Sequence, residues 1–178
     1  MNQIAKVLIV VSMLLNTAIA SAAFVTTNSA GANGFVTGAF PTFTLAGTDK
    51  EVDDDSVTLT TYTDTFLSDT TISFDWVYLT NDEDGSIYDK AGYVLNDTYT
   101  QLSPDNLFTF GTANGTVMLS LVAGDTFGWY IDATDGLAGR AFLDVSPSAV
   151  PVPAALPLMA SALGAFGVAR RRNQAKNA

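Results

Sequence analysis

The feature that most constrains the fold of this chain is an alternation of apolar and polar residues with a period of two. The apolar positions of the clearest example are Ile72, Phe74, Trp76 and Tyr78. The same spacing recurs in residues 116–122 and 126–132. Alternation of this kind is typical of a β-strand with one buried face, whereas an amphipathic helix repeats every ~3.6 residues. These segments therefore predict strands, and Trp76 and Trp129 are expected in the core.

Turn-forming residues divide the middle of the chain into short segments. The expected strands cover residues 35–40, 43–46, 56–62, 71–79, 91–96, 98–102, 107–110, 116–122, 126–132 and 140–146. Asn33-Gly34, Asn96-Asp97 and Asn114-Gly115 favour the positive φ angles of tight hairpins. Short strands separated by such turns predict an all-β fold, an antiparallel β-sandwich of jelly-roll type.

Charged residues are distributed unevenly along the 178 residues. All 18 acids lie in residues 24–149, where only Lys50, Lys90 and Arg140 oppose them, so this segment has a net charge of −15. The chain has no cysteine and no histidine, which excludes disulfides, thiol nucleophiles, histidine bases and zinc sites built from these residues. Residues 24–149 contain no basic run or stripe, so no nucleic-acid partner is expected.

The first 23 residues predict a secretory signal peptide. Lys6 is followed by an uncharged apolar run over residues 7–15 and then by small residues up to Ala23. This order matches the basic, apolar and cleavage regions of a segment processed by signal peptidase. We expect cleavage after Ala22 or Ala23. The alternative is a buried N-terminal helix, which would show polar residues at helical spacing on one face.

Residues 150–178 form a second apolar segment with a basic end. A proline-rich tetrapeptide at 150–153 precedes an uncharged run at 154–169, and three arginines follow at 170–172. A helix over this run would span about 24 Å, and arginines that reach the interface can cover the shortfall from the ~30 Å hydrocarbon core. The arginines place this end in the cytoplasm. We therefore expect a transmembrane helix at 154–169, with the acidic domain, residues 24–149, on the periplasmic side of the inner membrane.

This tail resembles the PEP-CTERM sorting signal of Gram-negative bacteria, in its VPLPA-type variant. The residues that carry the resemblance are Val150, Pro151, Val152, Pro153, Arg170, Arg171 and Arg172. The usual motif has Glu between the prolines, where this chain has Val152. The resemblance implies recognition by an exosortase, an integral membrane enzyme that removes the tail near the proline motif. A plain C-terminal membrane anchor is the alternative.

Two stretches of the acidic domain, residues 71–97 and 121–141, are similar to the β-sandwich ectodomains that often precede PEP-CTERM signals. Such ectodomains carry no established activity. The resemblance therefore implies a sandwich fold and a location outside the cytoplasm, but no reaction.

Acidic residues gather in the expected loops, where calcium is the cofactor they would suit best. The candidate ligands are Asp53, Asp55, Asp82, Asp84 and Asp89. Calcium takes about six to eight oxygen ligands in a flexible geometry, which clustered loop carboxylates can supply. The spacing is not that of an EF-hand, because Ala91 stands where that loop needs its bidentate glutamate. Solvated loop charge that keeps the protein soluble is the alternative.

Aromatic residues offer a second route to binding, because exposed rings can stack on sugars. Tyr88 lies in an acidic loop, and Tyr130 lies on the opposite strand face from Trp129. These two tyrosines are the candidate ligand-contacting residues. Glycoside hydrolysis would need a matched pair of carboxylates across a cleft, and no pair stands out in the sequence.

Together, these features predict a non-enzymatic exported protein. After a membrane-anchored stage it would reach the cell surface or the extracellular space, with a structural or adhesive role in exopolysaccharide or biofilm. The alternative is a calcium-dependent carbohydrate-binding module. Since an acidic surface repels anionic polysaccharide, calcium would then bridge the two.

Overall fold

A computed structural model of the chain describes residues 23–50, 57–134, 136 and 138–148. The described residues form ten β-strands and no α-helix. The strands are β1 (Val25–Asn28), β2 (Phe35–Ala39), β3 (Thr42–Ala46), β4 (Thr58–Thr65), β5 (Thr70–Thr80), β6 (Asp89–Leu95), β7 (Thr98–Gln101), β8 (Thr112–Leu121), β9 (Thr126–Ala133) and β10 (Ala141–Pro147).

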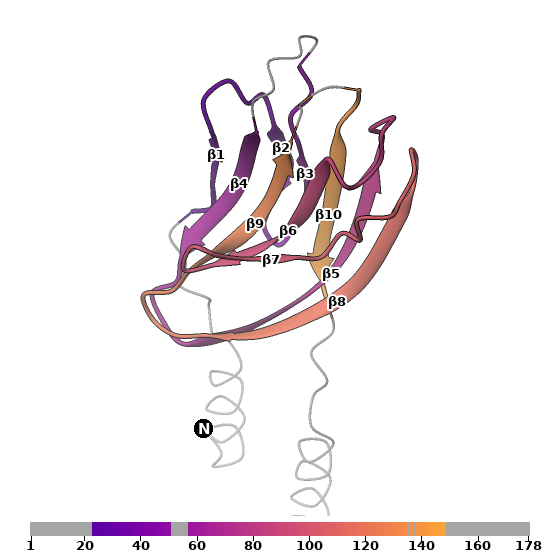
Figure 1. Cartoon of the computed structure of the whole chain (residues 1–178). Helices are drawn as coiled ribbons and strands as arrows, with labels where there is room; N and C mark the ends of the chain where they lie inside the picture. Colours follow the sequence, from indigo (N-terminus) through magenta and orange to yellow (C-terminus); the bar gives the residue numbers. More distant parts are fainter. Residues whose placement is uncertain (1–22, 51–56, 135, 137, 149–178) are drawn as a thin grey trace, which may run out of the picture. The chain divides into compact units, whose positions relative to one another are not determined.

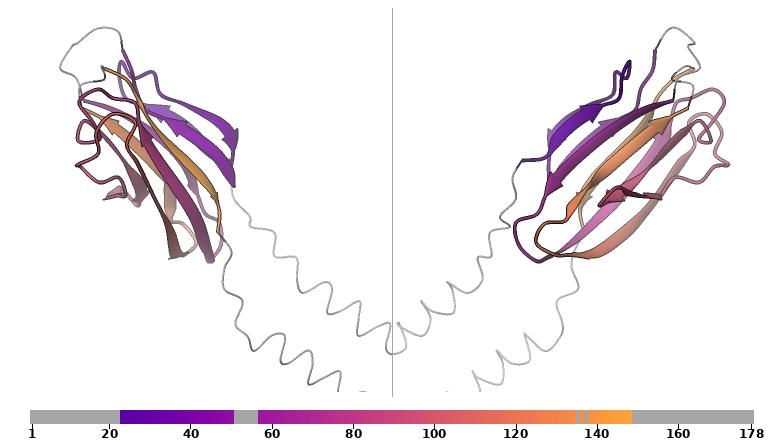
Figure 2. Two further views of the ribbon diagram at one scale, coloured as in Figure 1. Left: turned by 90° about the vertical axis from the view of Figure 1, so that its right-hand side faces the viewer. Right: turned by 60° about the vertical axis from the view of Figure 1, so that its left-hand side comes forward.

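The strands form two five-stranded antiparallel sheets, with the orders β1-β4-β9-β6-β7 and β2-β3-β10-β5-β8. Figures 1 and 2 show the two sheets packed as layers of a sandwich. Only the β2–β3 and β6–β7 connections join neighbours in one sheet, and every other connection crosses to the opposite sheet. The predicted antiparallel β-sandwich is therefore confirmed.

Aromatic side chains fill the space between the sheets. Trp129 of β9 is completely buried. Its indole lies 4.9 Å from the Phe43 ring and 5.3 Å from the Phe74 ring, both on the opposite sheet, in edge-on geometry. Trp76 is also buried. The predicted core placement of both tryptophans is confirmed, as is the buried face of β5 that carries Trp76.

One of the three predicted hairpin turns is confirmed and two are wrong. Asn96 and Asp97 have φ angles of 48° and 62° and join β6 to β7. Asn33-Gly34 joins β1 to β2, which belong to different sheets, so it forms no hairpin. Asn114-Gly115 lies inside β8, opposite Val77 and Trp76. A Cβ at Gly115 would meet the Trp76 indole at 3.0 Å, so this glycine gives the ring space within a strand.

The predicted strand at residues 107–110 is also wrong. These residues form a loop in which the Phe108 and Phe110 side chains are exposed and Phe110 has a φ of 60°. Apolar residues at i and i+2 gave a strand-like pattern, although neither ring enters the core. Conversely, β1 was not predicted, because its four residues are all exposed and show no alternation.

Several predictions fall outside the described residues. The signal peptide up to Ala22, the helix at 154–169 and the sorting motif belong to this group, as do Asp53 and Asp55. Ala23 is described and exposed. Within the described ranges, no helix is long and apolar enough to cross a membrane.

Replacing Trp129 with alanine tests the role of this core. Trp129→Ala is expected to lower the free energy of unfolding by about 3–5 kcal/mol, because it removes rings that contact both sheets and leaves a cavity. Urea unfolding followed by circular dichroism gives this quantity. Phe108→Ala is the matched control: its ring is 87% exposed, so its effect should stay within about 0.5 kcal/mol. Equal losses in the two variants would contradict the assignment.

Candidate functional site

The best candidate site is a recess on the outer face of the sheet β1-β4-β9-β6-β7. It has a volume of about 300 Å³. Its lining residues are Val57, Leu59, Lys90, Tyr99, Tyr130 and Asp132. We call this group the tyrosine recess. It combines two aromatic rings with one carboxylate and one ammonium group.

Strand register brings these residues together. Asp132 of β9 lies directly between Leu59 of β4 and Lys90 of β6, with which it pairs on either side. Directly opposed residues in an antiparallel sheet point to the same face. Tyr130, two residues earlier on β9, therefore shares the outer face with Asp132 and lies opposite Gly92.

Gly92 gives the Tyr130 ring its position. A Cβ at Gly92 would lie 2.8 Å from Cε1 of Tyr130 and 2.0 Å from the Thr100 carbonyl oxygen. Without that Cβ, the phenol ring lies over β6 and reaches the side chain of Tyr99 on β7. The two ring centroids are 4.9 Å apart with an interplanar angle of 83°, an edge-to-face contact.

Tyr99 presents the aromatic surface of the recess, and Tyr130 supports it. Tyr99 is 47% exposed, whereas Tyr130 is only 6% exposed. The outer-face placement of Tyr130 is confirmed, but the expectation that it offers an exposed ring is wrong, because Tyr99 and the neighbouring strands cover it. Sequence reasoning missed Tyr99. Its alternation with Thr98 and Thr100 is the signal that could have found it.

The electrostatics of the recess follow from its partial burial. Burial raises the pKa of the Asp132 carboxyl, and the nearby Lys90 opposes this shift. Burial also raises the pKa of Tyr130 to about 12, with contributions from Asp132 and then Tyr99. The phenol therefore keeps its proton at neutral pH. Oδ1 of Asp132 is buried and accepts no hydrogen bond from the described residues.

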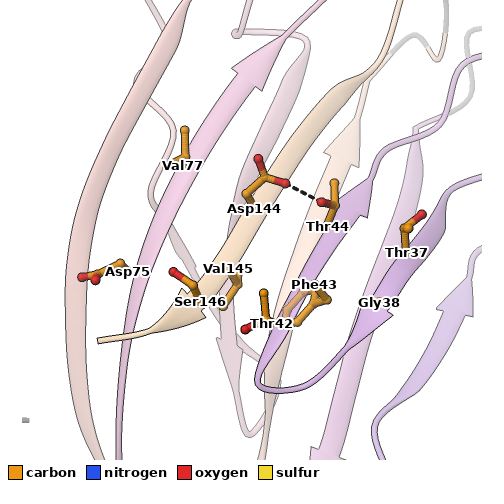
Figure 3. A pocket seen from close by; sticks show the side chains of 10 residues that line it. All are labelled: Thr37, Gly38, Thr42, Phe43, Thr44, Asp75, Val77, Asp144, Val145 and Ser146. Carbon is orange, nitrogen blue, oxygen red and sulfur yellow. Dashed lines mark hydrogen bonds between the residues drawn. The ribbon is translucent and has the colours of Figure 1, made fainter. Parts of the chain in front are cut away.

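A second recess of about 300 Å³ lies on the outer face of the other sheet (Figure 3). The Asp144 carboxylate there accepts a hydrogen bond from the Thr44 hydroxyl, and Asp75 accepts one from Thr116. Phe43 also lines the recess, but it is a buried core residue. Its carboxylates already accept hydrogen bonds, and none of its lining residues is an exposed aromatic residue. This recess is therefore a weaker candidate for a ligand-binding site than the tyrosine recess.

The described loop carboxylates that are predicted to bind calcium differ in their exposure to solvent. Asp82 and Asp89 are buried, whereas Asp84 is exposed. Oδ1 of Asp82 accepts hydrogen bonds from the backbone N–H groups of Asp84 (2.6 Å) and Gly85 (3.1 Å), so this side chain holds the turn. Among the described residues, no three Asp or Glu side chains gather closely enough to hold a metal. Calcium binding stays a prediction.

The other candidate ligand-contacting tyrosine, Tyr88, is 39% exposed and does not line the tyrosine recess.

Comparison with known proteins gives no family for this chain. No protein-family model and no curated protein matches it. Among solved structures, it is similar to a family 35 carbohydrate binding module from an environmental isolate, with 19% identity, a TM-score of 0.36, and coverage of 76% of this chain and 96% of the other. For a family 35 module from Clostridium thermocellum, the identity is 10%, the TM-score 0.35, and the coverage 69% and 92%. Similarity at this level assigns neither a family nor a ligand.

The raised pKa of Asp132 predicts a pH-dependent effect on stability. A carboxyl whose pKa is higher in the folded state than in the unfolded state lowers the free energy of unfolding once it is ionised. At a pH low enough to protonate this carboxyl in both the folded and the unfolded chain, the loss of stability disappears. Asp132→Asn should therefore unfold at a higher temperature than the wild type near pH 7. The difference should shrink as the pH falls and vanish below about pH 3, under the unfolded-state pKa.

Asp125→Asn provides a control of opposite sign. Hydrogen bonds from Asn96 and from the Val122 backbone lower the pKa of Asp125. This substitution should therefore lower the melting temperature near neutral pH. Melting curves from pH 2.5 to 8 measure both variants, and a lower melting temperature for Asp132→Asn at pH 7 would contradict the assignment.

Proposed function

We propose that this chain is a non-enzymatic, exported glycan-binding protein of the cell surface or extracellular matrix, and that the tyrosine recess is its binding site. The observation that carries the proposal is the half-exposed Tyr99 ring, held edge-on by Tyr130, next to Lys90 and Asp132. An aromatic ring offers the apolar face of a sugar a flat surface, and the adjacent polar groups suit its hydroxyls.

The geometry supports recognition of a small sugar unit. Binding sites with few polar groups around apolar walls orient a ligand through those polar groups. Here, Asp132 accepts a hydrogen bond, Lys90 donates, and the Tyr130 phenol keeps its donor proton because its pKa is raised to about 12. The volume of about 300 Å³ fits one or two sugar rings at the end of a chain or along it.

The charge of the domain favours an uncharged glycan. Residues 24–149 hold 18 acids and only three basic residues, so their field repels anionic polysaccharide. Within the recess, one acid and one base nearly balance. A neutral glycan would therefore bind without calcium, whereas an acidic one would need calcium to bridge it to the protein.

The recess suits binding better than hydrolysis. Glycosidases generally use two carboxylic acids on opposite sides of the bond that breaks. Asp132 is the single carboxylate among the lining residues. Residues 24–149 also lack histidine and cysteine, the side chains most often used to activate a nucleophile.

The terminal segments support export. A signal peptide at residues 1–23 would direct the domain across the inner membrane, and the tail at 150–178 would hold it there with the domain on the periplasmic side. An exosortase would then remove the tail. The product would be released to the cell surface or the extracellular matrix, where glycan binding gives it a structural or adhesive role in exopolysaccharide or biofilm.

Replacing Tyr99 tests the binding site. We expect the wild-type chain to bind a neutral oligosaccharide, such as a fragment of mannan, xylan or β-glucan, in a calorimetric titration. Tyr99→Ala should weaken this binding about tenfold, which corresponds to roughly 1.4 kcal/mol and is in the range for one aromatic contact. Tyr88→Ala is the matched control, because it removes a tyrosine of comparable exposure, 39% against 47% for Tyr99, that lies outside the recess.

The same titration separates the alternatives. Equal loss of affinity in Tyr88→Ala and Tyr99→Ala would place the site elsewhere. Binding that disappears with EDTA and returns with calcium would indicate the calcium-dependent module. If the wild type binds no glycan at all, glycan binding would be excluded and a purely structural role would remain.

Processing of the tail is a separate prediction. In a cell that has an exosortase, the mature protein should lack residues 154–178, which mass spectrometry of the secreted fraction detects. Replacing Arg170, Arg171 and Arg172 with alanine should leave the uncleaved precursor in the membrane fraction. A wild-type chain that remains at the inner membrane with its tail intact would show that the segment is a plain anchor.

A further inference from the structure

Phe24, the residue before β1, packs its ring into the aromatic core. The centroid of this ring lies 4.8 Å from that of Phe40 in the β2–β3 turn, 5.1 Å from that of Tyr62 on β4 and 5.5 Å from that of Trp129 on β9. These contacts connect the two sheets. Ala23, one residue earlier, is exposed. The packed part of the domain therefore begins at Phe24.

A buried carboxylate, that of Asp64 near the end of β4, lies beside this starting point. β1 pairs with β4 from Val25 opposite Thr63, so the same register puts Phe24 opposite Asp64. Opposed residues of an antiparallel pair have Cα atoms about 4.5–5.5 Å apart. The Asp64 side chain is on the buried face of β4 and is only 6% exposed.

Hydrogen bonding directs the Asp64 carboxylate toward the β1 edge. Its Oδ1 accepts a hydrogen bond of 2.7 Å from the Thr65 N–H. The Ser29 N–H donates to the Leu59 carbonyl, and because bonding alternates along antiparallel strands, the odd-numbered residues of β4 face β1. The Thr65 N–H therefore points to where a paired residue 23 would lie. The carboxylate takes that place, beside the backbone nitrogen that joins residue 23 to Phe24.

The second oxygen of this carboxylate needs a donor. Oδ2 of Asp64 is buried and accepts no hydrogen bond from the described residues, and a buried carboxylate is costly unless it is paired or hydrogen-bonded. The peptide N–H of Phe24 does not suit this role. Only the odd-numbered residues of β1 bond to β4, so the single N–H of Phe24 is directed away from that strand.

The basic side chains of the domain lie at the other end of the strands. Residues 24–149 contain only three of them. Lys90 shares its register position with Leu59, which is five residues, or about 17 Å, from Asp64 along β4. Arg140 precedes β10 and Lys50 follows β3, at the end of these strands opposite the β2–β3 turn. None of these three side chains is placed to pair with Asp64.

We propose that signal peptidase cleaves the Ala23–Phe24 bond and that the new α-ammonium group of Phe24 pairs with the Asp64 carboxylate. Hydrolysis adds one water molecule, leaving a carboxylate on Ala23 and an amine on Phe24 that binds a proton at neutral pH. The ammonium group has three hydrogens where the amide had one, so it can donate to Oδ2. Processing thus attaches the start of β1 to β4 and stabilises the mature domain. This inference rests on the export part of the proposed function, not on glycan binding.

Moving the amino group tests the ion pair. The chain from Phe24 to Ala178 is released from a fusion by a protease that leaves no extra residue, and it is kept in mild detergent. A second chain has Gly-Ser before Phe24, which moves the amine by about 7 Å. In urea unfolding followed by circular dichroism, this extension should raise the equilibrium constant of unfolding about tenfold, or roughly 1.4 kcal/mol.

Asp64→Asn completes a double-mutant cycle. Asparagine keeps an oxygen for the Thr65 N–H but has no charge, so the extension should no longer change the equilibrium constant of unfolding. Asp97→Asn is the matched control. It removes one exposed acid from the β6–β7 turn, and the tenfold effect of the extension should remain.

The cleavage site is measured separately, by mass spectrometry of the chain exported from a Gram-negative host. The mature protein should begin with Phe24. A mature protein that begins at another residue would overturn this inference and leave export intact, whereas a chain that keeps its first 23 residues would contradict both. The ion pair is also excluded if the extension has no effect on the wild type, or if its effect is equal in the wild type and in Asp64→Asn.

Discussion

The packing of Trp129 between the two sheets is the interaction on which the rest of the structure depends. Its ring contacts Phe43 and Phe74 of the opposite sheet and Phe127 of its own strand. Because side chains alternate along a strand, burying Trp129 and Ile131 forces Tyr130 and Asp132 onto the outer face. The tyrosine recess is thus a consequence of how the core is filled, and a shift of β9 by one residue would exchange core and site.

A second constraint is the absence of a side chain at Gly92. Antiparallel pairing fixes the distance between β6, β7 and β9, and the outer surface of β6 would normally carry a side chain between its neighbours. The open space at Gly92 lets the Tyr130 ring cross β6 and meet Tyr99 on the edge strand. A four-residue edge strand has few contacts of its own, so this aromatic contact also stabilises β7 against the sheet.

Sequence reasoning predicted the layers well and the site only partly. Alternation identified the inward-facing residues of β5, β8 and β9, because the periodicity of each strand can be read from that strand alone. The partners of Tyr130 could not be found in this way, since Tyr99 and Lys90 come from other strands and meet it only through register. The role of a glycine was also ambiguous in the sequence: Gly115 was predicted to form a turn, but it lies within β8 and leaves space for the Trp76 ring. The same limit applies to Asp82: its carboxylate accepts hydrogen bonds within its own turn, a role that the acidic composition of the loop does not indicate.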